Sequence, residues 1–174
     1  AAMRSAPRKS RKIKKEMGQL PVDDYEKFKK EKDAREKKNI LEWTKDIFKK
    51  AKQGVLNPKE FIQNTEMYKS IHLKYLSLLE FIDDASFAVP ALLMFVMLGG
   101  FLRRKLTDIS GDVVDKAEKK ILADKINELV DTANNMLAAI EEFDGSSLSI
   151  EETQKIRLFL KDSVKMLPPP DTLE

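Results

Sequence analysis

Residues 86–105 read SFAVPALLMFVMLGGFLRRK, and this stretch decides what kind of helical protein the chain forms. Residues 85–102 carry no charged side chain. A helix of that length rises about 27 Å, close to the roughly 30 Å of a bilayer core. Pro90 and the pair Gly99-Gly100 are tolerated better in a membrane helix than in a soluble one. We therefore expect a single transmembrane helix over about 85–102.

Two other interpretations of this stretch stay open. The central helix of a soluble bundle is also apolar on every side, provided that several neighbouring helices supply apolar stripes to enclose it. A re-entrant or monotopic segment is the third interpretation. The flanking charges suit a membrane helix, because Asp83 and Asp84 precede it and the basic triplet Arg103, Arg104 and Lys105 can reach lipid headgroups. The membrane segment would then cover residues 85–105.

The composition favours an all-α fold without catalytic machinery. The 174 residues include only six Gly and seven Pro, and no segment alternates apolar and polar residues as a strand does. The absence of Cys excludes disulfides, a thiol nucleophile and cysteine-ligated zinc. His72 is the only His, so a metal site has no second imidazole or thiolate, and a buried structural His is the simpler interpretation. We expect no catalytic, cofactor-binding or metal-binding residues, no cofactor and no small-molecule substrate.

Two amphipathic helices are predicted before the apolar stretch, in residues 21–84. A charged helix should run to about Gln53. A second should begin at Asn57 as N-cap, with Pro58 in its first turn, and continue to about Ile82. Apolar side chains recur three and four residues apart on both helices, and these faces are candidate partner contacts; the residues singled out on them are Trp43, Ile47, Phe61, Tyr68 and Tyr75.

A helical hairpin is predicted after the stretch, in residues 110–167, before a Pro-rich tail at 168–174. Its first helix should end near Phe143, where Gly145 can adopt a left-handed conformation. The last helix should begin at a capping box formed by Ser149 and Glu152 and end near Met166.

Residues 1–20 form a basic arm that we expect to be disordered when alone. Its net positive charge suits an acidic protein surface or acidic lipid, whereas the absence of interleaved aromatic residues disfavours nucleic acid. The basic residues predicted to contact a partner or lipid are Arg4, Arg8, Lys9, Arg11, Lys12, Lys14 and Lys15. The acid-poor start predicts a mature protein that follows a cleaved organellar transit peptide; the alternative is a cloning remnant before Met3.

These features together predict a non-enzymatic single-pass protein of an organellar membrane. It would act as an accessory subunit or assembly factor of a larger complex, with other membrane-protein subunits and the bilayer as partners. We favour the plastid thylakoid over the mitochondrial inner membrane. The alternative is a soluble all-α interaction module with a buried central helix, and the third hypothesis is a nucleic-acid-associated protein that uses the basic arm.

Overall fold

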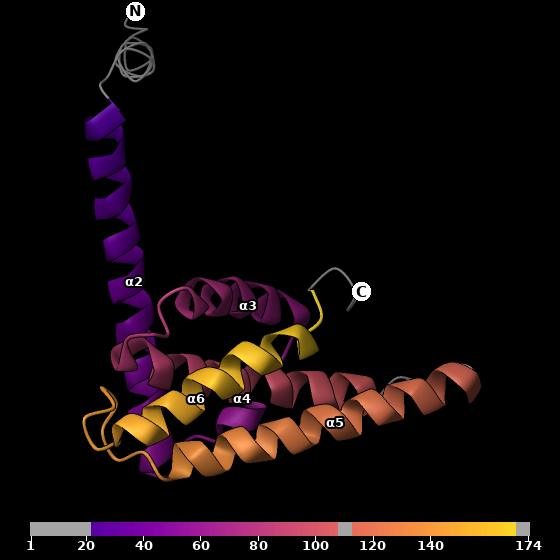
Figure 1. Cartoon of the computed structure of the whole chain (residues 1–174). Helices are drawn as coiled ribbons and strands as arrows, with labels where there is room; N and C mark the ends of the chain where they lie inside the picture. The colour runs from indigo at the N-terminus through magenta and orange to yellow at the C-terminus, as the bar shows by residue number, and fades with distance from the viewer. Residues whose placement is uncertain (1–21, 108–112, 170–174) are drawn as a thin grey trace, which may run out of the picture. The chain divides into compact units, whose positions relative to one another are not determined.

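The computed structural model describes residues 22–107 and 113–169, and every regular element in these ranges is helical (Figure 1). The prediction of an all-α fold is confirmed. The α-helices are α2 (Val22–Lys52), α3 (Thr65–Leu79), α4 (Ala85–Thr107), α5 (Val113–Ala138) and α6 (Ile150–Ser163), and two short 3-10 helices are η1 (Pro58–Glu60) and η2 (Val164–Met166).

The chain divides into two compact units, residues 1–39 and residues 40–174. Within the first unit, the described residues form the N-terminal part of α2, in which most side chains are exposed. The second unit holds residues 40–52 of α2 and all the later helices. The division falls inside α2.

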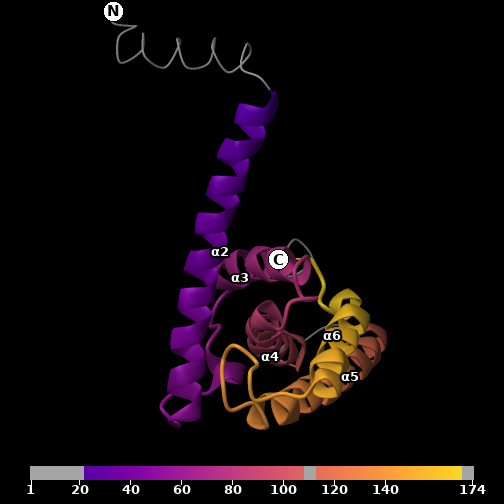
Figure 2. The same cartoon turned by 60° about the vertical axis from the view of Figure 1, so that its left-hand side comes forward.

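In the second unit α4 is the central helix of a bundle. Figure 2 looks nearly along α4 and shows α3, α5 and α6 around it. The apolar window of α4 is 83% buried inside the protein, and residues 88–100 are buried without exception. Each neighbour contributes its apolar stripe to the core around α4, including Ile71 and Leu78 from α3, Ile126 and Val130 from α5, and Ile156 and Leu160 from α6. The faces predicted from three- and four-residue spacing are thus used to cover α4.

Glycine lets two neighbours approach α4 closely. A Cβ on Gly100 would overlap the Lys59 carbonyl oxygen and lie 2.9 Å from the Lys59 Cα. A Cβ on Gly99 would overlap a methyl group of Val130 on α5. In the sequence, this glycine pair favours a membrane helix. In the structure Gly100 makes room for η1, and Gly99 makes room for α5.

The predicted second helix is interrupted near its start. Asn57 caps only η1, by accepting a hydrogen bond from the Lys59 N–H. The chain then leaves the helical path, buries Ile62 completely and begins α3 at a second cap, where Asn64 accepts from the Met67 N–H at 2.8 Å. The break has a packing reason, because it buries the Ile62 side chain in the core while the Arg104 guanidinium binds the Ile62 carbonyl oxygen.

The hairpin helices are present with corrected ends. α5 stops at Ala138 rather than near Phe143, and the Lys52 ammonium of α2 donates to the carbonyl oxygens of Leu137 and Ala138 at 3.0 and 3.2 Å. The last carbonyls of a helix have no partner within it; the Leu137 carbonyl oxygen also accepts from the Ile140 N–H beyond α5, and the Lys52 cation further stabilises the early end. Gly145 is left-handed with φ of 78°, as predicted. The predicted capping box at Ser149 is also confirmed.

Candidate functional site

The residues predicted to flank a membrane helix make contacts within the bundle. Asp84 accepts a hydrogen bond from the Ser86 N–H at the start of α4. The Asp83 carboxylate lies 3.3 Å from the Lys161 ammonium, and its carbonyl oxygen accepts from the Arg157 guanidinium of α6 at 2.6 Å. At the other end, Arg104 donates to the Ile62 carbonyl oxygen at 2.5 Å. Asp83 and Arg104 therefore contact other segments of the bundle at the two ends of α4.

The candidate partner faces lie mostly inside the bundle. Tyr68 and Tyr75 on α3 and Ile47 on α2 are buried and belong to the core around α4. Trp43 and Phe61 are half-buried and contact each other, with ring centroids 6.1 Å apart. In this conformation the first three side chains lie in the core and are not accessible to a partner. The residues of the basic arm from Arg4 to Lys15 lie outside the described residues.

The inner face of α3 buries three polar rings. His72 is 7% exposed and stacks on Tyr68 with ring centroids 5.4 Å apart. The Tyr68 hydroxyl donates to the Pro168 carbonyl oxygen at 3.0 Å, whereas the Tyr75 hydroxyl and His72 Nδ1 have no hydrogen-bond partner among the described residues. Burial lowers the pKa of His72 and raises the pKa of both tyrosines. This face holds neutral groups in the core and offers no base paired with a nucleophile.

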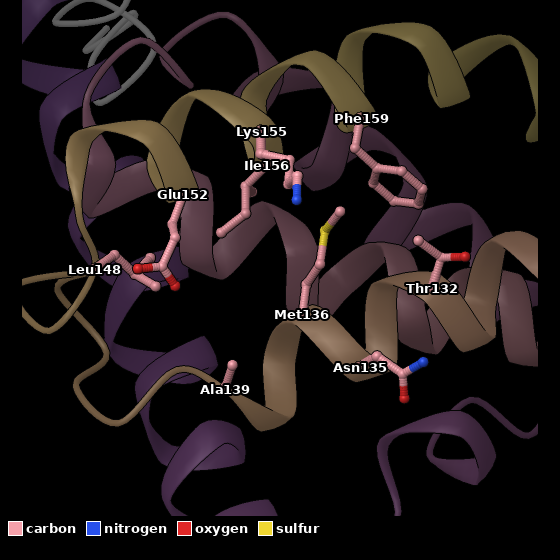
Figure 3. A pocket seen from close by; sticks show the side chains of 9 residues that line it. All are labelled: Thr132, Asn135, Met136, Ala139, Leu148, Glu152, Lys155, Ile156 and Phe159. Carbon is pink, nitrogen blue, oxygen red and sulfur yellow. The ribbon is translucent and has the colours of Figure 1, made fainter.

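A groove of about 650 Å³ lies on the second unit between α5 and α6 (Figure 3). Its walls are largely apolar, and the apolar side chains come from both helices and from the loop between them: Met136, Ala139, Leu148, Ile156 and Phe159. Four polar side chains line it as well: Thr132 and Asn135 from α5, and Glu152 and Lys155 from α6. A pocket with mostly apolar walls and a few polar groups is the usual form of a small-molecule site.

The sequence did not reveal this groove. Periodicity gives the face of each helix in the predicted hairpin and not the angle between the two helices. In the structure α5 and α6 lean apart along their length, and both pack on α4 (Figure 1). The contact of Phe159 with Phe95 of α4, at a centroid distance of 5.4 Å, fixes α6 on the core instead of against α5.

Metal binding has no support in the part of the chain that the structure describes, since no group of three or more His, Asp or Glu side chains there could hold an ion. α4 is the one helix among the described residues that is long and apolar enough to cross a membrane; within its segment Ala85–Leu106, an 18-residue window has a mean hydropathy of 2.1. Comparison with protein-family models, with curated proteins and with solved structures found no significant match for this chain.

Proposed function

We propose that this chain is a non-catalytic helical interaction module, built as a bundle around α4. The observation that carries the proposal is the burial of 83% of the apolar window of α4 by the chain's own helices. If α4 left the bundle for a bilayer, the apolar stripes of α3, α5 and α6 would lose the surface they cover. Removing that much apolar area from a core is costly, at roughly 25 cal/mol for each Å² exposed.

The N-terminal part of α2 is the partner-binding segment in this proposal. Residues 23–39 are polar and mostly exposed, yet Tyr25 and Phe28 are 51% and 57% exposed. The two aromatic side chains are three residues apart and therefore share one face of the helix. Large aromatic residues on an otherwise charged helix are typical anchors of a protein interface. A helix of this composition gains little stability from its own sequence, so a bound partner would also stabilise it.

Photo-crosslinking tests this proposal in cells that express the full chain. A photoreactive amino acid replaces Phe28 in one variant and Ile150 in a second, matched variant; Ile150 is 87% exposed at the start of α6. We expect the first variant to trap a defined protein at a fixed mass, and the second not to trap it. An identical pattern from both positions, or no adduct at position 28, would contradict the assignment of the partner-binding segment.

An accessory subunit of an organellar membrane complex is the second candidate function, and the length and hydropathy of α4 favour it. Alkaline carbonate extraction of membranes, followed by protease protection of each terminus, separates the two candidates. Release into the supernatant supports the bundle around α4. Retention in the pellet with one protected terminus supports a span, and the bundle would then be a different state of the chain. Salt-sensitive binding of RNA that is lost on deleting residues 1–20 would instead support a nucleic-acid role for the basic arm.

A further inference from the structure

We propose that the groove between α5 and α6 binds a single-chain amphiphile with an anionic head group, such as a long-chain carboxylate. The alkyl chain would lie along the apolar walls, and the Lys155 ammonium would hold the head group. This site is separate from the partner-binding segment on α2, because every residue that lines the groove lies between Thr132 and Phe159.

The shape and lining of the groove suit an alkyl chain. Its volume of about 650 Å³ falls within the usual range for small-molecule sites, about 300–1,000 Å³. Three turns of helix, taken as a cylinder 10 Å across, would fill on the order of 1,200 Å³. The groove therefore suits a chain of methylene groups better than a whole partner helix. Met136 and Phe159 face each other across it from α5 and α6, and methionine adapts its side chain to flexible apolar ligands.

The charges along the groove suit an anionic head group. Figure 3 shows the Lys155 side chain reaching from α6 toward α5. Its ammonium has no ion pair or hydrogen bond to any other residue in the described ranges. The neighbouring Glu152 carboxylate is engaged in the capping box, where it accepts from the Ser149 N–H at 3.3 Å. An uncommitted cation beside an apolar wall favours an anionic head group over a neutral or cationic one.

Isothermal titration of the full chain with three twelve-carbon probes, each below its micelle concentration or solubility limit, tests the proposal. The probes are dodecanoate, dodecanol and dodecyltrimethylammonium. We expect one dodecanoate to bind per chain, with dodecanol at least tenfold weaker and the cationic probe weaker still. Dodecyl phosphate in a fourth titration distinguishes a carboxylate site from a phosphate-headed lipid site. Failure of dodecanoate to bind would overturn the proposal.

Three variants locate the site. Lys155→Met should weaken dodecanoate binding about tenfold and leave dodecanol unchanged, whereas Lys165→Met makes the same charge change in η2 and should have no effect. Ala139→Trp should fill the groove and abolish binding of every probe; Ala139 is exposed, so this variant should still fold. Equal dodecanoate affinity in Lys155→Met and Lys165→Met would overturn the role of Lys155. Wild-type affinity in a folded Ala139→Trp protein would place the ligand elsewhere.

Discussion

Gly100 of α4 lies directly against the backbone of Lys59, so closely that no other residue type fits at that position without moving η1. Lys59 belongs to η1, which Asn57 caps, and its ammonium also lies 3.2 Å from the Asp131 carboxylate of α5. The contact is between two backbones, so no side chain can rotate to relieve an added methyl group. It ties the most apolar helix of the protein to a short polar turn.

Gly100→Ala should therefore destabilise the protein by about 3 kcal/mol, the upper end of overpacking costs. Gly99→Ala is the matched control, because its added methyl group meets the Val130 side chain, which can shift more easily than a backbone. We expect Gly99→Ala to cost about 1 kcal/mol. Urea denaturation followed by circular dichroism measures both free energies of unfolding. Equal stability of Gly100→Ala and wild type would show that α4 does not pack against Lys59 in solution.

The basic triplet that ends α4 offers a second test of the bundle. Arg104 donates to the carbonyl oxygen of the fully buried Ile62, whereas the half-buried Lys105 nearby has no hydrogen bond or ion pair to another described residue. Arg104→Met should cost about 1.5–3 kcal/mol, since it removes a charged donor from a part-buried carbonyl. Lys105→Met should change the free energy of unfolding by no more than about 0.5 kcal/mol. If the triplet served only as a headgroup anchor, the two substitutions would have similar effects on chemical denaturation.

Much of the local structure could be predicted from the sequence, because its causes are local. The capping box of Ser149 and Glu152, the left-handed Gly145 and the apolar stripe of each helix follow from residue type and spacing within a few positions. The early end of α5 does not, since it depends on Lys52, which is 85 residues away from Leu137 in the chain. The break before Asn64 likewise depends on the space that Ile62 finds in the core.

The placement of α4 in the centre of the bundle could not be predicted from the sequence. An apolar helix of this length has the same composition in a bilayer and in the centre of a bundle, so residues 85–102 cannot distinguish the two. Covering α4 requires the stripes of α3, α5 and α6 to meet it at compatible angles, which is a property of the whole fold. The groove near Lys155 has the same origin, because it exists only where two helices that share a core lean apart.

The start of α6 gives a local prediction with a known magnitude. The Ser149 hydroxyl accepts from the Glu152 N–H at 3.1 Å, and the Glu152 carboxylate accepts in return from the Ser149 N–H. Ser149→Ala should cost about 1 kcal/mol, because it leaves a helix N–H without its partner. Ser77→Ala, at an exposed position within α3, is the control and should be neutral within about 0.5 kcal/mol. Thermal unfolding of the two variants side by side checks the difference, and a smaller loss at 149 than at 77 would rule out the capping role.

His72 makes the stability of the bundle depend on pH. Burial lowers its pKa below the ordinary value of 6.5, so the folded protein binds its proton less readily than the unfolded chain does. As the pH falls below 6.5, the unfolded state gains protons first, and the free energy of unfolding decreases until the pH passes the lower, folded-state pKa. Well above 6.5 both states hold a neutral ring, and His72 adds no pH dependence.

His72→Phe should remove this dependence. A phenyl ring can keep the stacking on Tyr68, and the loss of Nδ1 breaks no hydrogen bond because that atom has no partner. Wild type should unfold at a lower urea concentration at pH 5.5 than at pH 7.5. The variant should show a smaller decrease in its urea midpoint between the same two pH values. The carboxylates are the same in both proteins, and the sequence has no other His, so the difference between the two shifts belongs to residue 72. If the urea midpoints of the two proteins changed equally with pH, the imidazole would be as well solvated in the folded bundle as in the unfolded chain. His72 would then not be buried by the packing of α3 in solution.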